Sequence, residues 1–257
     1  MKSLIMHALE DFPMVRAGDD VGRIIVEVAE RNHISIEDND VVVVAQKIFS
    51  KAEKRVFRLK DVVASKRAEK LSRATGKDPR FVELVLRETR VVLKASREIL
   101  LVKDTRGLVC INAGIDKSNI EGDENFALLP ENPDRSARKC RMTIEKLTGK
   151  RVAVVMCDTY SRPFRRGQVN FAIGVSGTKL FRDYRGKKDL FGHVLKVKNV
   201  TVVDEIASAA ELLMGQGAEG TPVVIIRGLG ESKELIEKGR IRELTISSKD
   251  DLFKGVL

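Results

Sequence analysis

Aromatic residues are scarce in the 257-residue sequence: they make up 5% of it, and tryptophan is absent. Proteins that bind single-stranded nucleic acid usually stack bases on aromatic side chains, so that platform is missing. Apolar runs are short as well, and none reaches the roughly 18 residues that a membrane-spanning helix needs. The apolar start of the chain soon gives way to acidic residues, unlike a secretory signal. We therefore expect a cytoplasmic protein that binds neither membrane nor nucleic acid.

Cysteine occurs only at Cys110, Cys140 and Cys157, without the paired spacing of a zinc site. An odd number of distant cysteines argues against a disulfide framework, and each is expected to be a small core residue.

Two phosphate-binding fingerprints are also missing. The sequence contains no G-x-x-x-x-G-K-[ST] motif and no G-x-G-x-x-G motif that opens a helix. A P-loop or a Rossmann nucleotide site is therefore not supported.

Positive charge is in excess, with 47 Lys and Arg against 37 Asp and Glu and a net charge of +10. Such a balance calls for an acidic partner. A small polyanionic substrate or a set of phosphates explains it as well as nucleic acid does. The length allows one large domain or two closely packed smaller ones.

The stretch from Arg151 to Gly192 carries the densest set of candidate functional groups. Val152–Cys157 is short, β-branched and apolar, which predicts a buried strand that ends at Asp158 and Thr159. A loop with three arginines and the second strand Phe171–Val175 follow. A carboxylate and a hydroxyl beside clustered guanidinium groups suit a metal ion and an anionic substrate. Alternatively, this is a surface loop that its arginines merely solvate.

Val41–Ala45 is the clearest buried strand, and Gln46, Lys47 and Lys51 follow it directly. Functional groups gather where strands end, so the two lysines are candidates for binding phosphate. The alternative is that they lie on the solvated edge of a continuing strand.

Two further loops are candidates. Asn112–Asn119 follows an apolar strand and supplies Asp116 as a second candidate metal ligand, unless Asp116 only bonds its own turn. The glycine-rich Met214–Pro222 would let a backbone approach a phosphate or nucleobase, although such a segment is often only a helix C-cap.

Helices and strands alternate along the chain. Expected helices are Asp20–Asn32, Ser65–Gly76, Pro79–Arg90, Asp134–Thr148, Asp204–Met214 with Asp204 as its cap, and one from Glu231 that leads into a charged tail. Further expected strands are residues 3–9, Val91–Lys94, Leu100–Val102, Leu108–Ile111, Val194–Val203 and Val223–Ile226.

Several blocks in fixed order support a family resemblance. They are Gln46–Lys47 with Ser50–Glu53, Asn112–Asp116 with Ser118–Asn119, Asp158–Thr159 with Arg162 and Phe164–Gly167, Ala172–Gly174 with Gly177, and Leu213–Gly215. The chain thereby resembles the γ-glutamyl ligases that extend the tail of the deazaflavin coenzyme F420. The match runs from about Asp11 to Gly228, so we expect a ligase domain over residues 1–228 and a C-terminal helix and tail over 229–257.

The resemblance implies an α+β fold of mixed sheets with flanking helices, two intimately packed subdomains and a homodimer. It implies a GTP-dependent amide ligase. The enzyme would phosphorylate the terminal carboxylate of F420-0, and L-glutamate would attack the acyl phosphate, with release of GDP and phosphate. Two divalent cations per active site, Mg²⁺ or Mn²⁺, and K⁺ are implied as well.

Site residues follow from the same resemblance. The metal ligands fall on Asp116 and Asp158, which we also assign to catalysis, and on Thr159 and Gln216. Other members have Glu where this chain has Gln216, and an amide oxygen can ligate a hard cation but brings no charge. Guanine-nucleotide contacts fall on Phe12, Pro13, Met14, Val15, Gln46, Lys47, Lys51, Asn119, Met214, Gly215, Gly217, Ala218, Glu219, Gly220 and Thr221. Arg162, Arg165 and Arg166 are hypothesised to bind the substrate's phosphodiester and carboxylates.

Two other functions fit parts of the sequence. A basic nucleic-acid-binding protein would explain the net charge and would bind with steep salt dependence. A metal-dependent phosphatase could use the same two aspartates, the threonine and the arginines.

Overall fold

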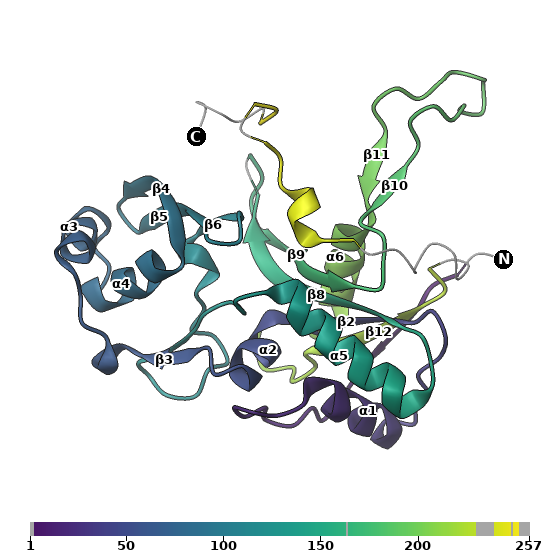
Figure 1. Ribbon diagram of the computed structural model, residues 1–257, viewed down its shortest axis with the longest axis horizontal. Coiled ribbons are helices and arrows are strands. Elements are labelled where there is room, and N and C mark those ends of the chain that lie inside the picture. Colours follow the sequence, from purple (N-terminus) through teal and green to yellow (C-terminus); the bar gives the residue numbers. More distant parts are fainter. Residues whose placement is uncertain (1–2, 163, 230–238, 248, 252–257) are drawn as a thin grey trace. The chain divides into compact units, whose positions relative to one another are not determined.

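The computed structural model describes residues 3–162, 164–229, 239–247 and 249–251 as helices, strands and loops (Figure 1). They divide into two compact units. Unit 1 comprises Met1–Met14, Asp20–Ala45 and Pro133–Leu257, and unit 2 comprises Val15–Asp19 and Gln46–Asn132. The expected combination of helices and mixed sheets is confirmed. None of the helices in the described residues is long and apolar enough to cross a membrane.

A five-stranded mixed sheet forms the centre of unit 1. Its strand order is β1 (Ile5–Ala8), β12 (Val223–Arg227), β2 (Val41–Ala45), β8 (Ala153–Ser161) and β9 (Gln168–Ser176). Only the β2–β8 pair is parallel, and its register places Ala45 opposite Cys157. The apolar run of β2 is fully buried, as a strand covered on both faces must be.

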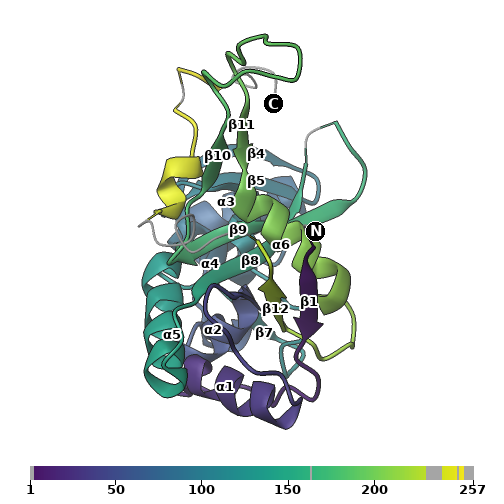
Figure 2. The same ribbon diagram turned by 90° about the vertical axis from the view of Figure 1, so that its right-hand side faces the viewer.

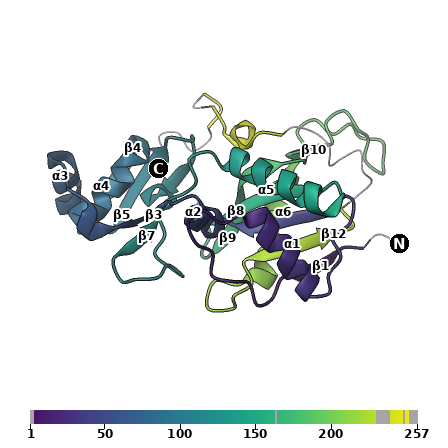
Figure 3. The same ribbon diagram turned by 60° about the horizontal axis from the view of Figure 1, so that its bottom comes forward.

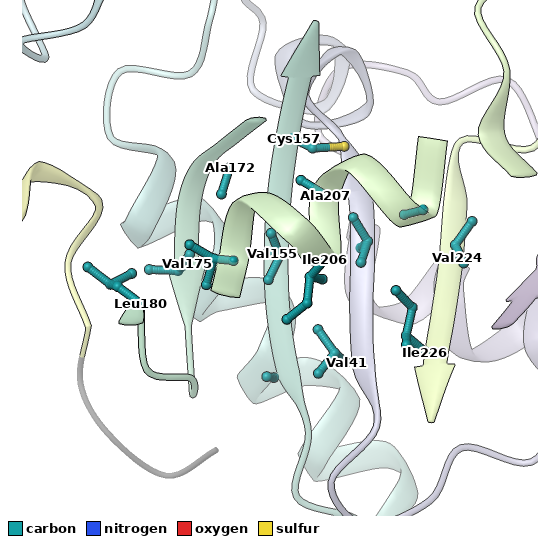
Figure 4. Packing of buried hydrophobic residues seen from close by; sticks show 14 of the residues in the cluster. Val41, Val155, Cys157, Ala172, Val175, Leu180, Ile206, Ala207, Val224 and Ile226 are labelled. Carbon is teal, nitrogen blue, oxygen red and sulfur yellow. The ribbon is translucent and has the colours of Figure 1, made fainter. Parts of the chain in front are cut away.

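Helices cover both faces of this sheet (Figures 2 and 3). Helices α1 (Val21–Arg31) and α5 (Pro133–Thr148) pack against each other, and α5 packs on β8 and β9. Helix α6 (Val202–Met214) packs on the opposite face, where Ile206 and Ala207 meet side chains of the central strands (Figure 4). The sheet thus separates two apolar layers.

The three cysteines belong to the buried interior, as expected. Cys157 lies in the layer under α6, with its Sγ 3.9 Å from the sulfur of Met214. Burial and the neighbouring Asp158 carboxylate raise the pKa of the Cys157 thiol to about 12, so it stays protonated at neutral pH. A protonated, buried thiol is an inert packing group rather than a nucleophile.

Side chains of two helices bind the outer edge of β9. The backbone N–H of Ala172 donates to Asp204 Oδ1 at 3.0 Å, and Ser208 Oγ donates to the carbonyl oxygen of Asn170 at 2.8 Å. Farther along, Val175 N–H donates to Asp134 Oδ1 at 2.9 Å. These bonds satisfy groups that a bare edge strand would expose, and they fix β9 against α6 and α5.

Three local expectations for unit 1 are wrong. Strand β8 continues through Ser161, so Asp158 and Thr159 lie within the strand rather than at its end. The expected strand Val194–Val203 reduces to β11 (Asn199–Thr201), which pairs with β10 (Phe181–Asp183), because its last valines begin α6. The cap of α6 is therefore Thr201, and Asp204 is free to bond β9 instead. The short helix η3 (Ile241–Leu244) is the last helix or strand among the described residues, and the start of the helix expected from Glu231 lies outside them.

Unit 2 contains short helices and two antiparallel sheets. Its helices are α2 (Gln46–Ala52), η1 (Leu59–Asp61), α3 (Lys66–Thr75), α4 (Pro79–Arg87) and η2 (Asn112–Gly114). One sheet pairs β3 (Val56–Arg58) with β7 (Asn125–Ala127). The other has the strand order β4 (Thr89–Ser96), β5 (Ile99–Asp104) and β6 (Val109–Ile111). The two residues that bounded the expected helix cap α3: Ser65 accepts from Ala68 N–H at 3.2 Å, and Gly76 is left-handed with φ of 73°. Helix α4 ends at Arg87, before the expected Arg90, because β4 begins at Thr89.

A buried ion network stabilises unit 2. Arg106 bonds Asp104 at 2.6 Å and Glu88 at 2.7 Å, and Arg55 bonds the other oxygen of Glu88 at 2.6 Å. The Asp104 side chain is 0% exposed and that of Arg106 is 8% exposed. A charge in such a place is tolerated only while its partners remain.

Arg106→Met should lower the free energy of unfolding by about 3 kcal/mol, because it leaves two buried carboxylates short of a partner. Arg87→Met is the matched control. The Arg87 to Glu83 pair is 3.9 Å long and half-exposed, so its loss should cost less than about 0.5 kcal/mol. Guanidinium chloride unfolding of both variants checks this, and equal losses would contradict it.

Candidate functional site

Lys47 and Lys51 lie on helix α2, so the alternative that they extend strand β2 is wrong. They are four residues apart and therefore share one side of the helix. Lys47 Nζ lies 2.8 Å from Asp116 Oδ2 and donates to Ser118 Oγ at 2.8 Å. Unit 2 thus brings together Lys47, a candidate for binding phosphate, and Asp116, a candidate metal ligand from a distant loop.

Asp116 is held on several sides. Its Oδ1 accepts from Ser118 N–H at 2.8 Å and its Oδ2 accepts from Ser118 Oγ at 2.9 Å, while its backbone pairs with Ala127 of β7. The expected turn bonding is therefore present together with the ion pair to Lys47. Burial alone would raise the pKa of Asp116, but Lys47 and Ser118 outweigh it and lower that pKa. The side chain is accordingly a carboxylate at neutral pH, as a cation ligand must be.

A left-handed turn precedes Asp116. Asn112, Ala113 and Gly114 have φ of 54°, 55° and 70°. A Cβ at Gly114 would come within 2.7 Å of the Leu129 side chain, so glycine is required for space as well as for its φ. Ala113 in this region is strained, and such strain persists only where the surroundings impose it. The turn directs the chain from β6 into the segment that carries Asp116.

Gln46 and Lys51 add further polar groups on α2. The Gln46 side chain is 1% exposed, and its Oε1 accepts from Ser50 Oγ at 2.8 Å. Its Nε2 is buried and finds no hydrogen-bond partner among the described residues, which is uncommon for a buried amide group. Burial and the nearby Lys47 lower the pKa of Lys51, and Glu121 acts in the opposite direction.

In unit 1, Thr159 of β8 lies opposite Asn170 of β9. Thr159 Oγ1 is 3.0 Å from Asn170 Oδ1 and 3.1 Å from Gln216 Oε1. Gln216 Nε2 donates to Glu211 Oε1 at 3.1 Å. Two of the expected metal ligands are thus brought together, and Asn170 and Glu211 join them without having been predicted. The strand pairing across the hairpin is the signal that could have identified Asn170.

The glycine-rich exit from α6 folds back on itself. Gly215 caps the helix in the left-handed region, and a Cβ there would collide with the Glu219 carboxyl group. Gly217 N–H donates to Glu219 Oε2 at 2.8 Å, and Thr221 Oγ1 donates to the carbonyl oxygen of Leu213 at 3.0 Å. The segment therefore caps the C-terminus of α6, and its backbone at Gly217 binds the carboxylate of Glu219 in the same segment.

The loop between β8 and β9 carries the arginines. Arg165 and Arg166 are exposed, and Arg162 donates to the carbonyl oxygen of Arg166 at 3.4 Å. Pro163 of this loop lies outside the described residues. Binding of substrate by these arginines stays a prediction.

The expected metal and nucleotide residues divide between the units. Unit 2 holds Asp116, Val15, Gln46, Lys47, Lys51 and Asn119, and unit 1 holds Asp158, Thr159, Gln216, Phe12–Met14 and the glycine-rich exit. Within the described residues, no group of three or more His, Cys, Asp or Glu side chains is placed to hold a metal ion. Metal binding by Asp116 and by Asp158 stays a prediction. The oxygen donors present in each unit fit a hard cation such as Mg²⁺ or Mn²⁺.

The Lys47–Asp116 pair can be tested by titration. In Lys47→Ala the burial of Asp116 is less opposed, so the pKa of Asp116 should rise above its wild-type value. Because that pKa is lowered in the folded wild type, ionised Asp116 stabilises the fold at neutral pH, and this contribution is lost as pH falls through the lowered pKa. Carboxyl-carbon NMR measures the pKa. Lys117→Ala is the control, since the Lys117 ammonium lies over the Phe126 ring at 6.0 Å. An unchanged pKa in Lys47→Ala would refute the assignment.

Comparison with known proteins identifies a family. A family model described as F420-0:Gamma-glutamyl ligase matches residues 11–228. The Coenzyme F420:L-glutamate ligase of Archaeoglobus fulgidus is 43% identical over 249 residues, which cover 97% of this chain and 96% of the relative. The protein of that name from Methanocaldococcus jannaschii is 43% identical over 220 residues, 86% of each chain. The one from Methanosarcina mazei is 44% identical over 223 residues, 86% of this chain and 85% of the relative. The resemblance inferred from the sequence is confirmed, and the chain belongs to the F420-0:gamma-glutamyl ligase family.

Proposed function

We propose that the protein is a GTP-dependent ligase that joins L-glutamate to the deazaflavin coenzyme precursor F420-0 through an amide bond. The observation that carries the proposal is the family match over residues 11–228, because every candidate site residue lies inside it. The relatives that are similar over most of the chain are named coenzyme F420:L-glutamate ligases, in agreement with this reaction.

The proposed reaction has two steps. A terminal carboxylate oxygen of F420-0 attacks the γ-phosphorus of GTP, the bond from that phosphorus to its bridging oxygen breaks, and GDP leaves. The amine of L-glutamate then attacks the carbonyl carbon of the acyl phosphate. A carbon–nitrogen bond forms, the carbon–oxygen bond to the phosphoryl group breaks, the nitrogen loses its proton and phosphate leaves.

The chain offers positive charge and donors for the phosphates. Lys47 and Lys51 lie on one side of α2 and supply two ammonium groups, and Gln46, which the family resemblance assigns to the nucleotide, precedes them in the helix. Phosphoryl transfer depends chiefly on positioning and charge stabilisation, so groups of this kind suffice. Arg162, Arg165 and Arg166 are assigned to the phosphodiester and carboxylates of F420-0.

Oxygen donors support a role for divalent cations. Asp116, Asp158, Thr159 and Gln216 would hold two Mg²⁺ or Mn²⁺ ions, and K⁺ would act as a monovalent activator. When bound, these ions neutralise charge on the transferring phosphoryl oxygens. Lys47 keeps Asp116 ionised and Ser118 orients its carboxylate, so the ligand is prepared before the cation arrives.

Exposed apolar side chains support the homodimer as part of this proposal. The arm from β10 to β11 in unit 1 (Figure 1) exposes Leu190, Phe191 and Val197 by 99%, 86% and 88%. An isolated strand pair is marginally stable in water, and clustered exposed apolar side chains mark interaction sites. We infer that a second copy of the chain covers the arm.

Asp158→Asn should reduce turnover about 100-fold or more, corresponding to roughly 3 kcal/mol of lost charge stabilisation. The assay contains protein, GTP, Mn²⁺, L-glutamate and F420-0, and it follows the glutamyl mass gain together with phosphate. Asp61→Asn is the control, because Asp61 is half-exposed and pairs only with Arg58 at 2.8 Å among the described contacts. Turnover of Asp158→Asn within about threefold of wild type would remove Asp158 from the metal site.

The same assay separates the rival functions. A nucleic-acid-binding protein would consume no GTP, and a phosphatase would release phosphate without needing glutamate. A mass gain that requires GTP and glutamate together is expected.

Leu190→Glu with Phe191→Glu should convert a dimer into a monomer, because buried glutamates would lack partners at the interface. Light scattering coupled to gel filtration measures the mass. Val63→Glu replaces an apolar residue of unit 2 that is 85% exposed and should leave the mass unchanged. A monomeric wild type, or a doubly substituted protein that stays dimeric, would disprove the arm as the interface.

A further inference from the structure

The Thr159 hydroxyl group lies between two amide oxygens. Asn170 Oδ1 is 3.0 Å from Thr159 Oγ1, and Gln216 Oε1 is 3.1 Å from it. A hydroxyl group has a single hydrogen, so it can donate to only one of these oxygens at a time. The other oxygen then faces the lone pairs of Thr159 with no proton between them.

The two amides are held with their oxygens toward Thr159. Gln216 Nε2 donates to Glu211 Oε1 at 3.1 Å, and turning this amide over would set its oxygen against the carboxylate. Asn170 Nδ2 lies 3.5 Å from Cys157 Sγ, on the side facing the core. Gln216 Nε2 approaches Asn170 Oδ1 only to 3.5 Å, the outer limit of a hydrogen bond. The two amide oxygens thus share one hydroxyl hydrogen, and Asn170 Oδ1 has only the distant Gln216 amide besides it.

Asn170 is also rigidly placed. Asn170 is 4% exposed and pairs with Thr159 across the β8–β9 ladder. Its backbone carbonyl oxygen accepts a hydrogen bond from Ser208 Oγ at 2.8 Å. An amide oxygen has two lone pairs, and Asn170 Oδ1 receives one hydrogen bond at 3.0 Å and a second donor only at 3.5 Å, so it can still accept a ligand. Hydroxyl and amide oxygens that converge without enough protons are the donors that hard cations take.

We propose that Asn170 Oδ1 is a further ligand of the cation that Thr159 and Gln216 bind. This inference rests on the proposed function for the existence of that cation. Asn170 on β9 thereby adds a buried, neutral oxygen to the two other ligands, Thr159 on β8 and Gln216 after the end of α6. Gln216 offers the cation one neutral amide oxygen where other members of the family have a carboxylate. An additional oxygen ligand from Asn170 raises the number of ligands around the cation.

Mn²⁺ binding to the full-length protein, followed by the electron paramagnetic resonance signal of free Mn²⁺, tests the proposal without catalysis. Asn170→Ala should weaken one class of Mn²⁺ sites by about 10-fold or more. Asn170→Asp keeps an oxygen in place and adds a charge, so it should bind Mn²⁺ at least as tightly as wild type. Asn199→Ala removes an exposed amide of β11 that lies outside the cluster, so its affinity should match wild type.

Thermal unfolding without metal shows whether each variant is folded, and the Asn170→Asp result decides the question if Asn170→Ala does not fold. Unchanged affinity in Asn170→Ala, or an equal loss in Asn170→Asp, would show a merely structural role and overturn the proposal. So would a wild type that binds no Mn²⁺. If the wild type binds Mn²⁺ with the expected variant pattern but forms no glutamyl amide, the proposed function fails and the role of Asn170 stands.

Discussion

The parallel pairing of β2 with β8 is the constraint on which the rest of the structure depends. Both strands are buried from Val41 to Val44 and from Ala153 to Cys157, and their register sets Ala45 opposite Cys157. The residues that follow these partners are Gln46 and Asp158. A slip of β2 by one residue would still leave valines in both apolar layers, but it would break the ion pair between the buried Asp40 carboxylate and Arg227 at 2.8 Å, so this pair helps to fix the register of β2.

The candidate polar groups of both units depend on less regular structure. Thr159 is oriented by Asn170 on the neighbouring strand, and β9 is held in turn by Ser208 and Asp204 of α6. Asp116 is oriented by Lys47 and by the left-handed turn that precedes it. In both units a second polar residue sets the orientation of a candidate oxygen ligand. Cation ligands in proteins are usually oriented in this way.

Local signals in the sequence predicted most elements because they act over a few residues. The Ser65 and Gly76 caps of α3 and the β-branched run of β2 are of this kind. The extension of β8 through Thr159 could not be foreseen, because polar residues continue a strand only when a partner such as β9 is present. The valines before Asp204 have strand propensity, yet they begin α6, where tertiary packing overrides that propensity. Lys47 and Asp116 were each identified as candidates, but their ion pair joins distant segments, and no local pattern reveals it.

The proposed ligase depends most directly on Asp116, which Lys47 and Ser118 hold as an oriented carboxylate in unit 2. The most direct test measures Mn²⁺ affinity in the presence of GDP for wild type, Asp116→Asn and the control Asp61→Asn. Asp116→Asn removes a charged ligand, so it should weaken Mn²⁺ binding about 10-fold or more, while Asp61→Asn should match wild type. Unchanged affinity in Asp116→Asn, or an equal loss in both variants, would contradict this role.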